Sequence, residues 1–269
     1  CFYINTLRID FNCSGNIFLH GFSIWGKFWS IGKDRRRRSP DLHGESLMKG
    51  SKPSPEKALS ALRAWYLVGI LGFSFSFTFS WFRYLTPLSL ILLAALYWLY
   101  HPHRDRKFYG ILGLIFLAGF LVEAAGVQTG KIFGVYSYGS ILGPKLAATP
   151  VIIGLNWVIM VYGALAISTR LSGRRSIAAL LAALFMTGSD VIIERFAILS
   201  GMWSWEAGTP PLQNYLAWFF ISLVLALLGN WLGLASRKNK VAAPLFFIQL
   251  LFFIAIDIWI IIERIWVSS

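Results

Sequence analysis

Four acidic residues well inside apolar stretches of this 269-residue chain are candidates for a functional site, because a charged side chain there is costly and usually faces a cavity or a partner. Glu123 lies near the end of one apolar run. Asp190 and Glu194 are four residues apart in another run, so a helix would place both on one face. Asp257 stands alone in the segment Ile256-Asp257-Ile258-Trp259 of the last run. We predict that Glu123, Asp190 and Glu194 meet in one site.

Carboxyl groups gathered in an apolar site can carry out acid–base chemistry. Burial raises the pKa of a carboxyl, so one group can keep its proton at neutral pH and donate it. A second, ionised carboxylate can position a water molecule and accept its proton. Asp190 or Glu194 is the expected acid, and Glu123 the expected partner. Structural roles are the alternative: an ion pair of Glu194 with Arg195, or a hydrogen bond from Asp190 to a neighbouring helix.

Two aromatic pairs occur in the connections between the apolar runs. Tyr136 and Tyr138 are separated by one residue, and so are Trp203 and Trp205. Alternate residues of an extended backbone point to the same side, so each pair would present two rings together. An aromatic face stabilises a desolvated cation by about 0.5–2 kcal/mol, and we expect these rings to line the site. Anchoring at the membrane interface is the alternative role.

The bulk composition is typical of a membrane protein. Hydrophobic residues make up 57% of the chain and charged residues 14%, with a mean hydropathy of +0.62, whereas soluble domains have about 25% charged residues. The net charge of +13 comes from short cationic runs between apolar segments, as in loops that set topology. We therefore predict an all-α, polytopic helical bundle in the cell membrane, in contact with lipid and without a nucleic-acid partner.

About seven apolar runs approach the roughly 20 residues with which a helix crosses a bilayer. They lie near residues 62–82, 85–100, 109–127, 150–169, 177–199, 214–235 and 243–267. Cations alternate between the two sides of these runs, which places the N-terminus in the cytoplasm and the C-terminus outside. The connections 128–149 and 200–213 then share the outer side. Both are rich in Gly, Pro and aromatic residues, so we expect them to fold back and close the site.

The first 47 residues differ from the rest of the chain. They include four consecutive arginines at 35–38 and no apolar run long enough to span a bilayer. Met48 is the first methionine, and a short polar leader follows it. We expect 1–47 to be an unstructured upstream extension and 48–269 to form a single transmembrane domain, with packed structure from about Ser54. A surface-binding arm built on the arginines is the alternative.

Sequence motifs for several other chemistries are missing. The chain has no P-loop, no dinucleotide-binding glycine pattern and no metal-binding histidine pair. Its two cysteines, Cys1 and Cys13, both precede the apolar body. The last apolar run contains no lysine that could hold retinal as a Schiff base. We therefore expect neither a metal nor an organic cofactor.

Two groups of motifs stand in order within residues 110–235. The first group is Glu123-Ala-Ala-Gly-Val-Gln-Thr-Gly130, Phe133-Gly-Val-Tyr136-Ser-Tyr138, Leu142-Gly-Pro144, Pro150 and Trp157. The second is Asp190-Val-Ile-Ile-Glu194, Trp203-Ser-Trp205 and Pro210-Pro211-Leu-Gln-Asn214-Tyr215-Leu-Ala-Trp218. In order and spacing they resemble membrane proteins of the carotenoid 1,2-hydratase family. That family includes bacterial gamma-carotene 1'-hydratases and archaeal bisanhydrobacterioruberin hydratases.

The resemblance implies that water is added across the terminal 1,2 double bond of an acyclic carotenoid end group. Protonation of the alkene would give a tertiary carbocation, and water would capture it as a tertiary alcohol. The partners would be a carotenoid from the lipid phase and water, with no cofactor. The catalytic residues would be Glu123, Asp190 and Glu194. The substrate-binding residues would be Tyr136, Tyr138, Trp157, Trp203, Trp205, Asn214 and Trp218.

Two alternative functions stay open at the level of sequence. A carotenoid cyclase also protonates an alkene, but its cation closes on a neighbouring double bond instead of meeting water. The mass of the product separates these two reactions, because only hydration adds the mass of one water. A non-catalytic carotenoid or lipid carrier, or a small transporter, would bind the polyene without changing it. Transporters usually contain inverted repeats or broken helices at the midplane, and the sequence shows neither.

Overall fold

The structure, a computed structural model, describes residues 52–234 and 239–268. The expected extension at 1–47 lies outside these residues. In chain order the elements are α2 (Pro55–Ser74), α3 (Ser76–Phe82), the 3-10 helix η2 (Arg83–Leu85), α4 (Thr86–Tyr100), α5 (Arg106–Thr129), β1 (Tyr136–Tyr138), β2 (Lys145–Leu146), β3 (Thr149–Pro150), α6 (Ile152–Leu171), α7 (Arg175–Ser200), β4 (Trp203–Trp205), α8 (Leu212–Leu232) and α9 (Ala242–Ser268). Ser54 caps α2 by accepting from the Lys57 amide, so packed structure begins where it was expected.

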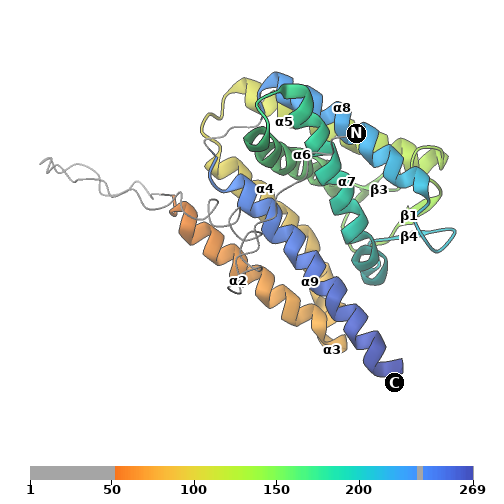
Figure 1. Cartoon of the computed structure of the whole chain (residues 1–269). Helices are drawn as coiled ribbons and strands as arrows, with labels where there is room; N and C mark the ends of the chain where they lie inside the picture. Colours follow the sequence, from red (N-terminus) through yellow and green to blue (C-terminus); the bar gives the residue numbers. More distant parts are fainter. Residues whose placement is uncertain (1–51, 235–238, 269) are drawn as a thin grey trace, which may run out of the picture. The chain divides into compact units, whose positions relative to one another are not determined.

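Helix α6 is the centre of the bundle (Figure 1). It packs against α5 and α7 on one side and against α4 and α9 on the other, and α8 packs mainly along α7. Within the apolar window of α6, 78% of the residues are buried. Helix α2 lies against α9 at the edge of the bundle. The apolar character of α6 therefore serves packing between helices, while the outer helices present apolar side chains outward.

Six of the described segments are long and apolar enough to cross a membrane: Ser76–Tyr100, Arg106–Thr129, Ile152–Leu171, Arg175–Ser200, Leu212–Leu232 and Ala242–Ile262. The chain is thus a multi-pass membrane protein, as the composition predicted. The first predicted span corresponds mainly to α2, which is not among the six. Its 20 residues include Glu56, Lys57 and Arg63, and these charges lower its hydropathy. The count of seven spans and the orientation stay predictions.

The predicted helix at 62–82 is wrong as a single helix, because the chain bends at Phe75. This residue has an extended backbone (φ −112°, ψ 128°) between the end of α2 and the start of α3. Thr78 stabilises the bend by donating its hydroxyl to the carbonyl of Gly72 at 2.7 Å. The ring of Phe82 occupies the space where a Cβ on Gly72 would lie. The bend thus occurs together with a close contact between Gly72 and Phe82. The spacing of apolar residues in the sequence does not reveal this contact.

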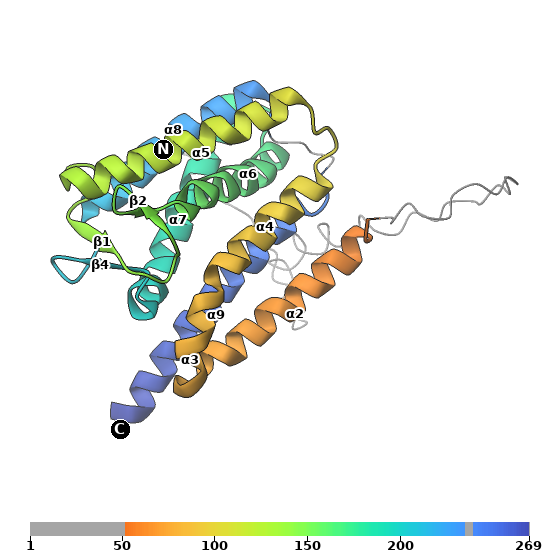
Figure 2. The same ribbon diagram turned by 180° about the vertical axis from the view of Figure 1, so that it is seen from behind.

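The protein is mostly helical, as predicted, and four short strands lie at the connections 128–149 and 200–213. Strand β1 pairs antiparallel with β4, with Tyr136 opposite Trp205 and Tyr138 opposite Trp203. Strands β2 and β3 form a second two-stranded sheet within the first connection. Figures 1 and 2 show both sheets at one end of the α5–α8 helices. The two connections therefore meet over the helix ends, as expected.

A buried polar cluster joins α4, α6 and the start of α9 farther along the bundle. The Tyr162 hydroxyl accepts from Nδ2 of Asn239 at 2.9 Å and pairs with Nδ1 of His101 at 2.6 Å. The imidazole of His101 stacks on Phe108. Burial lowers the pKa of His101 to about 4, so its ring is neutral near pH 7. The cluster is therefore a fixed structural contact at physiological pH.

Gly119 allows α5 and α6 to approach closely. A Cβ at this position would lie 2.4 Å from Cγ of Trp157, which is fully buried. Gly113 lies on the same helix, and no atom comes within 4 Å of the Cβ that it lacks. Replacing either glycine by alanine therefore adds the same methyl group to α5, but the methyl group meets a neighbouring side chain only at position 119.

We expect Gly119→Ala to destabilise the protein and Gly113→Ala to leave its stability unchanged or slightly raised. Alanine favours a helix over glycine by up to about 1 kcal/mol, whereas overpacking a filled interior costs about 1–3 kcal/mol. The collision with Trp157 therefore outweighs the helical gain only at position 119. Thermal unfolding of the purified proteins in detergent measures the difference. Equal melting temperatures for the two variants would contradict the close contact.

Candidate active site

The structure brings the three predicted acids together beneath the β1–β4 sheet. Glu123 on α5 is 3% exposed, and Asp190 and Glu194 on α7 are 4% and 5% exposed. Asp190 lies close enough to both glutamates for electrostatic interaction. The helical spacing placed Asp190 and Glu194 on one buried face, and packing of α5 through α6 adds Glu123. Their three environments differ, and the differences decide what each can do.

Glu123 accepts hydrogen bonds from three side chains. Its Oε2 accepts from the hydroxyls of Tyr136 at 2.5 Å and Tyr138 at 2.9 Å, and its Oε1 accepts from Nε1 of Trp157 at 3.2 Å. Burial raises the pKa of Tyr136 and of Tyr138, and the nearby Glu123 carboxylate raises both further. The tyrosines therefore remain neutral donors. Such a set of donors favours the ionised form of a carboxyl.

Glu194 is held by the two indoles of β4. Its Oε1 accepts from Nε1 of Trp203 at 2.9 Å and from Nε1 of Trp205. The neighbouring Arg195 is exposed, whereas Glu194 is buried. An ion pair between these two residues, the structural alternative considered above, therefore does not describe the environment of Glu194.

The pairing of β1 with β4 directs these rings inward. Tyr136 and Tyr138 point to Glu123, while Ser137 between them meets Ser204 of β4, at 3.3 Å between the hydroxyl oxygens, on the exposed side. Gly139 follows β1 and donates its amide to the carbonyl of Met202 at 2.8 Å. A Cβ on Gly139 would lie 2.0 Å from a backbone oxygen of the other connection. Only glycine permits this approach, which brings the two connections into register.

Asp190 is the acid with the fewest partners. Among the described residues its one hydrogen bond comes from Nδ2 of Asn214, which donates to Oδ2 at 2.9 Å. Asn214 and Trp218 are four residues apart on α8 and thus share a face. Trp218 stacks on Trp157, with ring centroids 4.3 Å apart. The same face of α8 therefore contacts Asp190 through an amide and, through Trp157, the group around Glu123.

A cavity lies beside Asp190, and we call it the Asp190 cavity. Its wall includes Asp190, Trp203, Trp218, Asn156, Gln249, Met160, Met202, Phe246 and Phe253. Of the predicted substrate-binding residues, Trp203 and Trp218 line this cavity. Tyr136, Tyr138, Trp157 and Trp205 instead hold the glutamates, and Asn214 holds Asp190. Most of the predicted aromatic lining is thus a support for the acids.

Two amides in the wall of this cavity were missed at the level of sequence. Asn156 on α6 and Gln249 on α9 form no hydrogen bond with any residue that the structure describes. Gln249 is only 7% exposed, which makes an unpaired amide there costly. Each is the one amide in its apolar run. The sequence could have identified them, because a polar side chain inside a membrane span is costly and usually has a function.

Asp257 lies apart from this site. It is half-buried on α9, lines neither of the cavities described for this protein, and interacts electrostatically with Arg195. Its isolation in the sequence thus corresponds to isolation from the other acids in space.

The arrangement suits proton transfer to a molecule in the Asp190 cavity. A carboxyl lines this partly open space together with two unpaired amides and two indoles. The carboxyl groups of Glu123 and Glu194 lie near it, and a negative charge on either would favour a cation in the cavity.

A family profile described as "Carotenoid biosynthesis protein" matches residues 86–268, about two thirds of the chain. The chain therefore belongs to the carotenoid biosynthesis protein family. This multi-pass membrane protein thus has a role in carotenoid biosynthesis, in keeping with an enzyme of that pathway. Neither a curated protein nor a solved structure matches the chain.

We expect Glu123→Gln to lower the stability of the protein. A glutamine amide has one acceptor oxygen and brings two donors of its own, so it cannot accept from Tyr136, Tyr138 and Trp157 together. Leaving a buried donor unpaired costs about 1–3 kcal/mol. Thermal unfolding in detergent measures the loss, with Glu206→Gln at an exposed position as the matched control. Equal stability of the two variants would show that the three hydrogen bonds contribute little.

Proposed function

We propose that this protein is a carotenoid hydratase. It adds water across the terminal 1,2 double bond of an acyclic carotenoid end group and forms a tertiary alcohol. The observation that carries the proposal is the Asp190 cavity, where one carboxyl and two unpaired amides line the same space. Membership of the carotenoid biosynthesis protein family supports the substrate class.

We assign the role of general acid to Asp190. Of the three acids, it alone contributes to the cavity wall in the described part of the chain. Glu123 and Glu194 are already engaged by three and two donors. Neighbouring carboxyls that cannot all ionise tend to share a proton, and the group with the fewest donors is the one that keeps it. Glu123, the expected partner, then acts through its charge and its hold on β1.

The reaction consists of two balanced steps. The O–H bond of Asp190 breaks, and the π electrons of the alkene take the proton, so that a C–H bond forms at C2 and a tertiary cation remains at C1. A water oxygen then bonds to C1, and a proton of that water returns to the Asp190 carboxylate. The faces of Trp203 and Trp218 stabilise the cation, and the charges of Glu123 and Glu194 add to this from behind the wall.

The amides of Asn156 and Gln249 hold the water. A buried water usually makes about three hydrogen bonds to polar groups that otherwise lack partners. Two amides and Asp190 provide that number within one cavity. A held water beside the cation favours hydration over cyclisation, because ring closure requires that no nucleophile stands closer to C1 than the next double bond.

We also propose that α2 is a seventh span and that the protein resides in the cell membrane. Twenty residues of helix measure about 30 Å, the thickness of a bilayer core. Helix α2 packs along α9, and its charges Glu56 and Lys57 lie in its first turn, near a membrane surface. The N-terminus would then lie in the cytoplasm and the C-terminus outside.

Asp190→Asn should lower hydration by at least about 100-fold, the lower end of the contribution of general acid catalysis. The amide of Asn cannot donate a proton to an alkene, yet it can still accept from Asn214. Expression from Met48 in cells that make lycopene, followed by mass spectrometry of the pigments, measures the product. Glu194→Gln should also lower activity strongly, because it removes the charge behind the wall.

Asp257→Asn is the matched control, since the same change there affects neither cavity. Wild-type hydration by the Asp190→Asn variant would exclude Asp190 as the acid. A wild-type product with the mass of the substrate would instead support a cyclase.

Gln249→Met and Asn156→Leu should change the product rather than stop protonation. Both substitutions keep the approximate size of the side chain and remove the groups that hold water. The cation would then lose a proton or close on a double bond, so the fraction of pigment with the added mass of water falls. Deuterium incorporation from D2O reports that protonation continues. An unchanged ratio of hydrated to unhydrated pigment in both variants would place the water elsewhere.

A further inference from the structure

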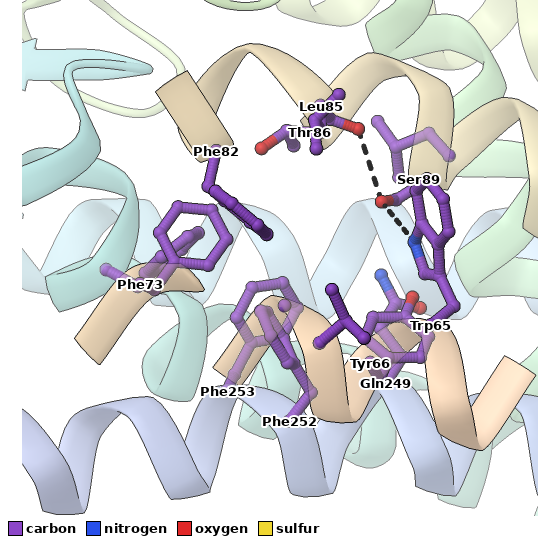
Figure 3. A pocket seen from close by; sticks show the side chains of 14 residues that line it. Trp65, Tyr66, Phe73, Phe82, Leu85, Thr86, Ser89, Gln249, Phe252 and Phe253 are labelled. Atoms are coloured by element: carbon purple, nitrogen blue, oxygen red, sulfur yellow. Dashed lines mark hydrogen bonds between the residues drawn. The ribbon is translucent and has the colours of Figure 1, made fainter. Parts of the chain in front are cut away.

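A second cavity lies between α2, α4 and α9, and we call it the aromatic cavity (Figure 3). Half of its lining residues are aromatic: Trp65, Tyr66, Phe73, Phe82, Phe196, Phe252 and Phe253. Phe73 meets Phe196 edge to face at 4.8 Å between centroids and also contacts Phe82 and Phe252. No role in the proposed reaction accounts for this cavity.

The aromatic cavity adjoins the Asp190 cavity. Four residues line both: Thr86, Leu90, Gln249 and Phe253. Thr86 and Leu90 are four apart on α4, and Gln249 and Phe253 are four apart on α9, so each helix turns one face to the junction. The two spaces thus lie side by side between α4 and α9, with these four residues at their common boundary.

The wall of the aromatic cavity suits a flat, apolar chain. The indole of Trp65 donates to the hydroxyl of Ser89 at 3.0 Å, and that hydroxyl donates to the carbonyl of Leu85 at 3.2 Å (Figure 3). These polar groups are therefore satisfied within the wall. Val68 and Leu85 line the cavity and are also 56% and 39% exposed on the outside of the bundle. This part of the wall therefore separates the cavity from the apolar outer surface of the bundle.

We propose that the aromatic cavity binds the polyene chain of a carotenoid whose end group occupies the Asp190 cavity. This inference rests on the proposed function for the nature of the ligand. A conjugated chain is long, stiff and planar, and aromatic faces stabilise it through dispersion over many contacts. The chain enters from lipid at Val68 and Leu85, passes between Leu90 and Gln249, and presents its terminal alkene to Asp190.

Blocking the junction tests this path. Leu90→Trp fills the space shared by the two cavities, and Thr86→Phe does so from one turn earlier on α4. Leu88→Trp is the matched control, because Leu88 is on the same helix and faces outward with 49% exposure. Each protein is purified from cells that make lycopene. The pigment retained per protein is read from visible absorbance, and its mass is determined from the same sample.

We expect the wild type and Leu88→Trp to retain pigment equally, and Leu90→Trp and Thr86→Phe to retain at least about 10-fold less while eluting as single species of normal size. Two results would overturn the inference: both junction variants retain as much pigment as the wild type, or the wild type retains as little pigment as the junction variants. If the junction variants retain wild-type amounts, an acyl chain of membrane lipid is the better candidate for the occupant. Retained but unhydrated pigment in the wild type would refute the hydratase while the binding path stands.

Discussion

Buried carboxylates require hydrogen-bond donors, and this requirement organises the closed end of the protein. Glu123 and Glu194 are on different helices, and no backbone donor is free in the middle of a helix to satisfy them. Their donors come from β1 and β4, which are far apart in the chain and pair with each other. The carboxylates, the rings of Tyr136 and Trp205, and the antiparallel register therefore support one another. Removing any one of them weakens the hydrogen bonding that holds the others in place.

The same arrangement separates three chemically similar acids into different roles. Donors surround Glu123 and Glu194, and such donors stabilise a negative charge. Asp190 has one amide donor and faces a cavity. In the proposed reaction, negative charge on Glu123 and Glu194 beside a protonated Asp190 would favour a carbocation, because charge that is already oriented needs no reorganisation when the cation forms. The aromatic residues contribute mainly by holding this environment in place.

The two cavities extend this logic to a long substrate. An end group that reacts as a cation needs a polar, water-holding space, whereas the rest of a carotenoid needs an apolar one. The junction has Leu90 of α4 on one side and Gln249 and Phe253 of α9 on the other, and it marks the change between these environments. A carotenoid held in this way would meet water only at its end. Hydration and cyclisation would then differ in the position of one water molecule, which in the proposed reaction the amides of Asn156 and Gln249 hold.

Much of this protein follows from the sequence alone. Apolar runs predicted the helices, the cost of buried charge identified Glu123, Asp190 and Glu194, and the spacing of the Tyr and Trp pairs predicted that the two rings of each pair lie on one side; the pairing of the two segments as strands was not predicted. These patterns are local, so a short window of residues contains them. Only the tertiary structure decided that Asp190 is the acid on the cavity wall, that the chain bends at Phe75, and that Gln249 lies at a junction. Those facts depend on which helix faces which, and that choice results from packing over the whole bundle.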